Sequence, residues 1–384
     1  MTDDFDCIID RRVTDCIKWQ AYDADVLPMW VADMDFAAPP PVIAALQARV
    51  AHGVFGYEAR PLALLEAIVA RLQQLYGWTV APEAIVFLPG VVTAFNLAAQ
   101  AFLAPGDGLL IQTPVYPPFL GAAATANAVT QGMELTLNAD GRYSVDFGLF
   151  EHTLTDRTRM FLLCNPHNPV GRVFRADELA RMAELCLRHN LLICSDEIHC
   201  DLIFSGYRHI PIAALSPEIA ARTITLMAPS KTFNIAGLHC SFAVIPDADL
   251  RRRYQAARRG VVETVNVLGY TAALAAYQEG QPWLDAVLRY LEANRDFVVA
   301  YVQEHMPGVT VAAPEGTYLA WLDCRAAGIP GNPHEFFLKQ ARVAMNDGAT
   351  FGAGGEGFVR LNFGCPRALL EEGLERMRAA LNQL

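Results

Sequence analysis

The middle of the chain alternates short apolar segments with amphipathic ones, and this alternation constrains the fold more than any other feature. Residues 160–164, 191–194 and 223–227 are apolar and predict buried strands, and residues 176–189 predict a helix between the first two. Strand–helix–strand alternation with short connections is typical of a mostly parallel sheet covered by helices, with right-handed crossovers. The sequence therefore predicts an α/β fold.

The pattern changes after residues 279–282. A long helical stretch over 283–304 is followed by scattered strand-like segments and a closing helix over 366–384. We expect two domains: a large one over residues 46–278, and a smaller α+β one formed by residues 1–45 and 279–384. The chain has no internal repeats or low-complexity linkers that would indicate further modules.

Charge and cysteine content exclude several classes of protein. The formal net charge is −11 and the basic residues are scattered, which argues against nucleic acid or an anionic membrane as the main partner. The acidic start of the chain lacks the features of a secretory signal, and no apolar run approaches the roughly 18 residues that span a bilayer. The nine cysteines form no metal-binding spacing. We expect a cytoplasmic protein with no metal site.

Polar side chains follow three successive predicted strands. Asn168 follows the first, Asp196 the second and Lys231 the third. Open parallel sheets bind ligands just beyond the carboxyl ends of their strands, so these three side chains are expected to meet in one cleft. Pyridoxal 5'-phosphate (PLP) chemistry needs such a set: a lysine for the Schiff base, a carboxylate for the pyridine nitrogen and an amide for the ring hydroxyl.

Two upstream segments fit the same interpretation. Gly90, Val91 and Val92 open a helical stretch, and a helix that begins at glycine offers free backbone N–H groups to a phosphate. Tyr116 could stack on a cofactor ring. Taken singly, each of these residues has an ordinary interpretation as a turn, a helix cap or a surface side chain. Their joint occurrence at strand ends favours the functional one.

These residues, together with Ser230 and Arg360, resemble the fold-type-I PLP-dependent enzymes. More narrowly, the chain resembles the MalY/PatB-type cystathionine β-lyases, or C–S lyases. The stretches that carry this resemblance span nearly the whole chain: 5–12, 27–36, 53–57, 165–171, 195–199, 230–237, 314–321 and 360–367. The resemblance implies a large PLP-binding domain with a mostly parallel seven-stranded sheet and a smaller α+β domain.

The resemblance also implies a role for each matching residue. Lys231 would hold the cofactor and act as the catalytic base, and Arg360 would bind the substrate carboxylate together with Tyr116 and Asn168. The implied cofactor-binding residues are Gly90, Val91, Val92, Tyr116, Asn168, Asp196, His199, Ser230, Lys231 and, from a second subunit of a homodimer, Tyr57. His199 stands where many aminotransferases have a tyrosine, and a histidine at this position agrees with the pattern of the C–S lyases. His239 stands where aminotransferases often have an arginine, which leaves the phosphate contacts incomplete.

The resemblance implies α,β-elimination of L-cystathionine or a related cysteine S-conjugate to pyruvate, ammonia and a thiol. An aminotransferase that acts on an amino acid and a 2-oxo acid stays open as the alternative, because both reactions begin with the same residues. Three other signals are interpreted as structural: the glycine-rich segment 351–357, the run His199–Asp201, and Asp33 with Asp35, whose carboxylates we expect to point apart.

Overall fold

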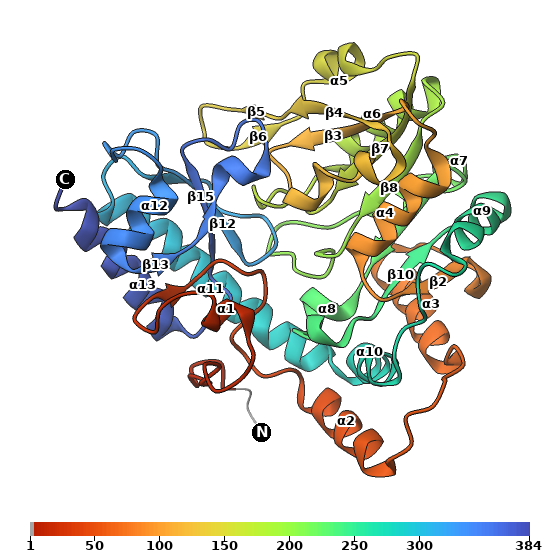
Figure 1. Cartoon of the computed structure of the whole chain (residues 1–384), viewed down its shortest axis with the longest axis horizontal. Coiled ribbons are helices and arrows are strands. Elements are labelled where there is room, and N and C mark those ends of the chain that lie inside the picture. The colour runs from red at the N-terminus through yellow and green to blue at the C-terminus, as the bar shows by residue number, and fades with distance from the viewer. Residues whose placement is uncertain (1–3) are drawn as a thin grey trace.

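The computed structural model describes residues 4–384, so that the first three residues of the acidic start of the chain lie outside the described part. Its central layer is a seven-stranded sheet in the order β2-β10-β9-β8-β7-β3-β4 (Figure 1). The neighbouring pairs from β9 to β4 are parallel, and β10 is antiparallel to both of its neighbours. The predicted mostly parallel, seven-stranded sheet is confirmed. The strands are β2 (Ile85–Leu88), β10 (Ser241–Val244), β9 (Thr223–Met227), β8 (Leu192–Asp196), β7 (Thr158–Cys164), β3 (Gly108–Thr113) and β4 (Val129–Glu134).

Successive side chains of these strands point to opposite faces of the sheet, and different helices cover the two faces. Leu162 on β7 packs in one apolar cluster with α4 (Val91–Phe102). Its neighbour Leu163 packs in another with α5 (Phe147–Thr153) and α6 (Ala176–Arg188). Since successive residues of a strand point to opposite faces, an entirely apolar strand requires helices on both sides. At the β2 and β10 end, α3 (Leu62–Tyr76) and α10 (Val267–Glu279) cover the sheet.

The predicted element bounds are close to those observed. The strand predicted at 223–227 is confirmed as β9, and the helix predicted at 176–189 ends one residue earlier. The strand predicted at 191–194 begins one residue later and continues through Ser195 and Asp196, which pair with Leu163 and Cys164 of β7. This extension was missed because ladder hydrogen bonds use the backbone and do not depend on side-chain polarity.

A second sheet lies beside the first and is antiparallel, in the order β11-β12-β15-β14. The long helix predicted at 283–304 is α11 (Gln281–His305), and the closing helix is α13 (Arg367–Leu381). Both pack on this sheet in one apolar cluster that also contains N-terminal residues. The strands are β11 (Thr310–Val311), β12 (Leu319–Asp323), β15 (Phe358–Asn362) and β14 (Asn346–Asp347).

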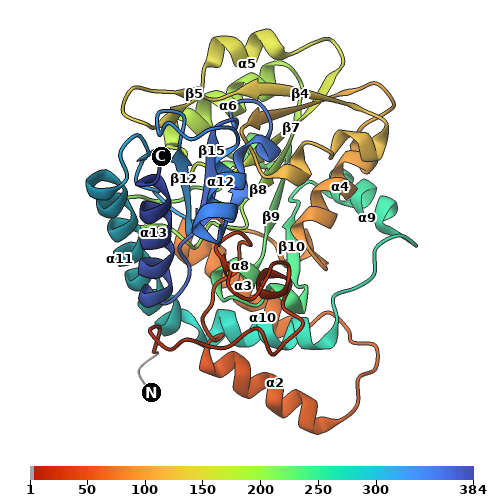
Figure 2. The same cartoon turned by 60° about the vertical axis from the view of Figure 1, so that its left-hand side comes forward.

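The N-terminal segment joins this second region, because β1 (Leu27–Pro28) pairs in parallel with β13 (Val343–Ala344). Helix α2 (Pro40–His52) and the loop after it project at the lower edge of the molecule in both views (Figures 1 and 2). The domain bounds at 45/46 and 278/279 stay a prediction. The remaining elements are α1 (Ile17–Gln20), β5 (Thr136–Leu137), β6 (Tyr143–Ser144), α7 (Pro217–Ala220), α8 (Pro229–Thr232), α9 (Ala248–Arg258) and α12 (Pro333–Phe336).

In the part of the chain that the structure describes, no helix combines the length and the apolarity needed to cross a bilayer.

Candidate functional site

The candidate site lies at the carboxyl edge of the central sheet. The polar segments predicted there follow β7, β8 and β9, which are adjacent in the strand order. Because these strands are parallel, Asn168, Asp196 and Lys231 leave the sheet at the same edge. The prediction that they approach one another is consistent with the contacts and electrostatic couplings described below.

Lys231 lies on the short helix α8, immediately after β9. Its Nζ donates a 2.6 Å hydrogen bond to the carbonyl oxygen of Ala32. Burial lowers the pKa of Lys231 to about 8, opposed by the negative charges of Asp33 and Asp196 and supported by the positive charge of Arg360. A lysine with this pKa has a large fraction of neutral amine near pH 8, as a nucleophile or general base requires.

The chain contains only three lysines, Lys18, Lys231 and Lys339. Lys18 is 1 % exposed and bound to Asp35, whereas Lys339 is exposed and paired with Glu335. Lys231 is therefore the one lysine that lies at the carboxyl edge of the sheet.

Asp196 is the last residue of β8 and is 4 % exposed. Burial raises its pKa to about 7, the nearby charge of Glu197 adds to this, and the backbone N–H of Ile198 and the charge of Lys231 oppose it. The Ile198 N–H donates to Asp196 Oδ1 at 3.1 Å. A buried carboxylate in this state would gain from a cationic N–H partner.

Arg360 enters the site from β15 of the second sheet. Its Nη1 donates a 3.0 Å hydrogen bond to Asn168 Oδ1, and its Nη2 donates to the Trp30 carbonyl at 2.9 Å and to Asn346 Oδ1 at 2.7 Å. The guanidinium lies 5.1 Å from the centroid of the Phe351 ring. Burial lowers the pKa of Arg360 to about 10, and its Nε has no hydrogen-bond partner in the described structure. A fixed cation with a free donor suits a carboxylate ligand.

His199 and Tyr116 complete the surroundings of these residues. Burial, together with the charges of Lys231 and Arg360, lowers the pKa of His199 to about 3, so the ring is neutral at neutral pH. Its Nδ1 is buried and, within residues 4–384, has no partner. Tyr116 donates its backbone N–H to the Asn168 carbonyl at 3.0 Å. Burial raises the pKa of the Tyr116 hydroxyl, with Asp196 adding and Arg360 opposing.

Gly90, Val91 and Val92 lie after β2, at the same edge of the sheet as Lys231, because β2 runs parallel to β9. Gly90 precedes the first turn of α4, whose early N–H groups have no partner within the helix. A Cβ built on Gly90 would meet no atom within 4 Å, so the space beside it is open. Ser230 precedes Lys231 on α8.

Within residues 4–384, Tyr57 and His239 form no hydrogen bond with the site residues described above. Tyr57 is fully exposed on the loop between α2 and α3, so this chain alone does not bring it into the site. His239 is exposed and has a left-handed backbone with φ 52°.

Several neighbours of the site were not predicted individually. The carbonyls of Trp30 and Ala32 hold Arg360 and Lys231, and the sequence offers no signal for a backbone carbonyl. Tyr318 donates its hydroxyl to the Ala32 carbonyl at 2.9 Å, and its ring lies edge-on to His199. Asn346 binds Arg360 from β14.

The expectation that Asp33 and Asp35 point apart is wrong. The segment around them forms no strand, and both carboxylates bind Arg11 and Lys18. Even in a regular strand, residues two apart share one face, so that the spacing itself does not separate them.

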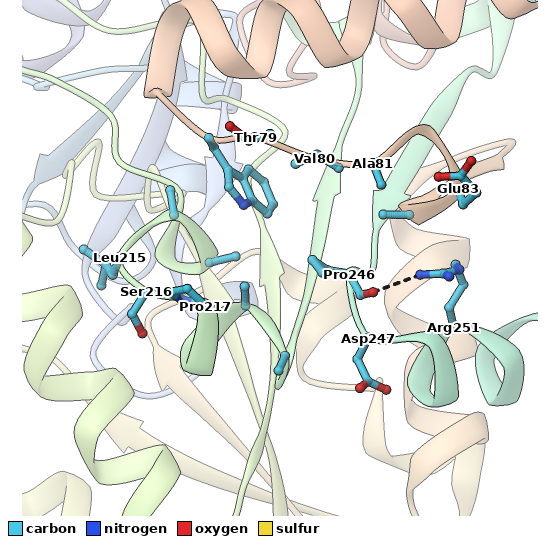
Figure 3. Close-up of a pocket in the computed structure, with 16 residues that line it drawn as sticks. Thr79, Val80, Ala81, Glu83, Leu215, Ser216, Pro217, Pro246, Asp247 and Arg251 are labelled. Carbon is cyan, nitrogen blue, oxygen red and sulfur yellow. Dashed lines mark hydrogen bonds between the residues drawn. The ribbon is translucent and has the colours of Figure 1, made fainter.

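A pocket of about 670 Å³ lies elsewhere, at the opposite edge of the central sheet (Figure 3). It is lined by segments that precede β2 and β9 and follow the antiparallel β10. Arg251, at its rim, already donates to the carbonyls of Ile245 and Pro246. None of the predicted site residues lines this pocket.

The family of the chain follows from its similarity to known proteins. A model of the aminotransferase class I and II family matches residues 24–377. The chain belongs to this family. The cystathionine β-lyase PatB of Bacillus subtilis is 42 % identical over 386 aligned positions, which cover 98 % of this chain and 100 % of PatB. The resemblance to MalY/PatB-type enzymes is therefore confirmed.

Solved structures of family members superpose over the whole chain. OvoB has a TM-score of 0.95 and 47 % identity, covering 99 % of this chain and 100 % of its own. Cystalysin from Treponema denticola, which contains a pyridoxal 5'-phosphate cofactor, has a TM-score of 0.96 and 34 % identity, covering 100 % of both chains. The predicted fold class is thus confirmed.

Proposed function

We propose that this chain is a PLP-dependent carbon–sulfur β-lyase. Its substrate would be L-cystathionine or a related cysteine S-conjugate, and its products pyruvate, ammonia and a thiol. One observation carries the proposal: Lys231, with an amine pKa of about 8, lies among Asp196, Arg360 and His199 at the carboxyl edge of the sheet. The full-length similarity to PatB, a cystathionine β-lyase, supports this choice among the reactions of the family.

The residues present fit PLP. Asp196 would pair with the pyridine nitrogen, since its buried carboxylate accepts only the Ile198 N–H within the described structure. Asn168 and the unpartnered Nδ1 of His199 would serve the ring hydroxyl. The open space at Gly90 and the free N–H groups at the start of α4 would take the phosphate, with Val91, Val92 and Ser230 beside it. Tyr116 would stack on the ring.

PLP, when bound through Lys231, supplies a sink for the electron pair released when a bond to the substrate Cα breaks. Arg360 would fix the substrate α-carboxylate through its free Nε and an Nη, which presents the Cα–H bond to Lys231. Once the substrate amine has taken the place of Lys231 on the cofactor, the freed neutral amine of Lys231 would take the Cα proton. The Cβ–S bond breaks as the Cα–Cβ double bond forms, and sulfur leaves with the bonding pair. Water hydrolyses the resulting enamine to pyruvate and ammonia.

We propose a homodimer in which Tyr57 of a second copy contacts the phosphate. Tyr57 is fully exposed in its own chain, and large apolar side chains near it in the sequence are exposed as well. A cluster of exposed apolar side chains of this kind is typical of an interaction surface. The exposed residues are Val50, Val54, Phe55 and Leu62. We also propose that residues 46–278 carry Lys231, Asp196 and Asn168 as one domain, and that the second domain, 1–45 with 279–384, supplies Arg360.

The test is an incubation of the PLP-loaded protein with L-cystathionine and no added 2-oxo acid, in which pyruvate and free thiol are both followed. Pyruvate and thiol in equal amounts are expected. If neither formed, and an amino group instead passed from an amino acid to a 2-oxo acid, the protein would be an aminotransferase and the lyase proposal would be wrong.

A further inference from the structure

Residues 30–35, which we call the 30–35 segment, form neither helix nor strand and contact the site. Two of its carbonyl oxygens bind the two cations of the site. The Trp30 carbonyl accepts from Arg360 Nη2 at 2.9 Å, and the Ala32 carbonyl accepts from Lys231 Nζ at 2.6 Å. The position of this segment therefore affects both cations.

Side chains from the rest of the molecule fix the backbone of the 30–35 segment. Asn362 donates Nδ2 to the carbonyls of Val31 and Asp33, at 2.5 Å and 2.6 Å. Asn234, three residues after Lys231, accepts from the Met34 N–H and donates to the Met34 carbonyl. The segment is thus tied to the residues just after α8, the helix that carries Lys231, as well as to β15.

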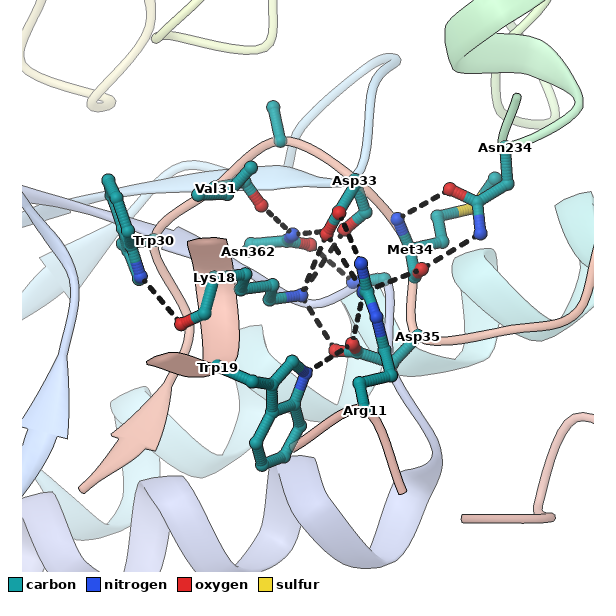
Figure 4. A network of polar contacts seen from close by, with 12 residues as sticks. Arg11, Lys18, Trp19, Trp30, Val31, Asp33, Met34, Asp35, Asn234 and Asn362 are labelled. Carbon is teal, nitrogen blue, oxygen red and sulfur yellow. Dashed lines mark hydrogen bonds and ion pairs between the residues drawn. The ribbon is translucent and has the colours of Figure 1, made fainter. Parts of the chain in front are cut away.

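A cluster of four charges holds the end of this segment (Figure 4). Arg11 donates to both oxygens of Asp33, at 3.1 Å and 2.6 Å, and to Asp35 Oδ1 at 2.6 Å. Lys18 binds Asp35 Oδ2 at 2.6 Å and lies 3.4 Å from Asp33 Oδ1. Trp19 donates its indole N–H to Asp35 at 2.8 Å. We call Arg11, Lys18, Asp33 and Asp35 the charge cluster.

The burial of the charge cluster argues against a role in stability alone. Lys18 is 1 % exposed and Asp35 is 3 % exposed. Burying ions costs several kcal/mol each, and an apolar replacement is often as stable, so a buried ion pair adds little to stability by itself. What such a cluster does supply is a fixed geometry, here for a segment that lacks the hydrogen bonds of a helix or strand.

We propose that the charge cluster, with Asp33 as its member nearest to the site, is a positioning element that fixes Lys231 and Arg360 through the 30–35 segment. That this positioning serves catalysis rests on the proposed function. The charge cluster takes part in no chemical step. Its members act through the 30–35 segment and by their charge.

The electrostatics of Lys231 agree with this role. The charged and titratable groups that face it are Asp33, Asp196, Arg360 and His199. Burial lowers the pKa of Lys231. Among the groups that raise this pKa, Asp33 has the largest effect. Although burial opposes it, the pKa of Asp33 itself is lowered by the Arg11 hydrogen bonds and the charge of Lys18, so that Asp33 is ionised at neutral pH.

The test measures the pKa of the Lys231 amine in cofactor-free protein, from the pH dependence of its acetylation rate followed by peptide mass spectrometry. Exposed Lys339 is the internal reference for reagent reactivity. The wild-type midpoint is expected at about 8. In Asp33→Asn it should fall by about 0.5–1 pH unit, because a nearby negative charge is removed.

Asp25→Asn is the matched control, since it removes the same charge from the same N-terminal segment, where Asp25 is exposed and pairs with Arg342. Its midpoint should equal that of wild type. An unchanged midpoint in Asp33→Asn would overturn the proposal, as would an equal shift in Asp25→Asn. Asp35 is left intact because its removal leaves the buried Lys18 charge without its closest partner, which destabilises the fold.

Arg11→Gln gives a second, independent readout, and Arg11, at 22 % side-chain exposure, is the more accessible of the two cations of the cluster. Loss of its three hydrogen bonds to the cluster should raise KM for L-cystathionine more than it lowers kcat, and Arg11→Lys should recover part of the affinity. Equal KM values in Arg11→Gln and wild type would also contradict the proposal. If wild type forms no pyruvate but the Lys231 midpoint still shifts in Asp33→Asn, the lyase function fails and the positioning role stands.

Discussion

Arg360 Nη1 donates a 3.0 Å hydrogen bond to Asn168 Oδ1, across 192 residues of sequence. This bond joins β15 of the second sheet to the segment after β7 of the central sheet. One cation thereby couples the two parts of the molecule at the point where the predicted cofactor and substrate would meet. Four predictions follow from the site built around it.

Replacing Arg360 with Lys should lower kcat/KM for L-cystathionine about 10- to 100-fold, because lysine retains the charge but loses the planar, bidentate geometry. Steady-state kinetics give this value. Arg325→Lys is the control, since Arg325 is exposed and pairs with Asp323 outside the site. An Arg360→Lys enzyme with wild-type kinetics would show that this arginine does not bind the substrate.

Replacing Asp196 with Asn should stabilise the cofactor-free protein at pH 8. Burial raises the folded-state pKa of Asp196 to about 7, above the ordinary value of 3.8. The folded state therefore loses stability as the pH rises from about 4 to about 7, and the neutral amide avoids this loss. Urea unfolding at pH 8 should give a free energy about 4 kcal/mol higher for Asp196→Asn, since the pKa rises from 3.8 to about 7 and one pKa unit corresponds to about 1.4 kcal/mol.

The difference should vanish below pH 4, where the wild-type carboxyl is protonated in both states. Asp156→Asn, at an exposed position, should change neither value. With PLP bound the order should reverse, because only the carboxylate pairs with a pyridinium nitrogen. A cofactor-free Asp196→Asn protein that is less stable than wild type at pH 8 would show that burial does not disfavour the ionised form of Asp196.

Tyr57 is predicted to act on the site of a second subunit. Lys231→Ala and Tyr57→Ala should each be nearly inactive alone, and co-expression should restore partial lyase activity, because a hybrid dimer contains one site with both residues intact. The measurement is the activity of hybrid dimers isolated with two different affinity tags. Isolated hybrids without activity would place Tyr57 outside the catalytic site of the partner.

The residues at the strand ends were predictable because apolar runs report strands locally, and a parallel sheet brings the ends of neighbouring strands together. Asn168, Asp196 and Lys231 each follow such a run. The contact of Lys231 with the Ala32 carbonyl was not predictable, because any residue type supplies that acceptor and 199 residues separate the two.

The error at Asp33 and Asp35 has a similar cause. The prediction placed both residues in a strand and on opposite faces, although residues two apart in a strand share one face. The tertiary partners Arg11 and Lys18 determine where both carboxylates point. Asn346 likewise gave no signal, since it reaches Arg360 only through the pairing of β14 with β15.

The most direct test of the central claim is to locate the cofactor on the chain. Borohydride reduction of the PLP-loaded protein, followed by proteolysis and peptide mass spectrometry, should find the reduced pyridoxyl phosphate on Lys231 alone of the three lysines, and Lys231→Ala should carry none and form no pyruvate from L-cystathionine. A label on Lys18 or Lys339, or substantial lyase activity in Lys231→Ala, would contradict the account.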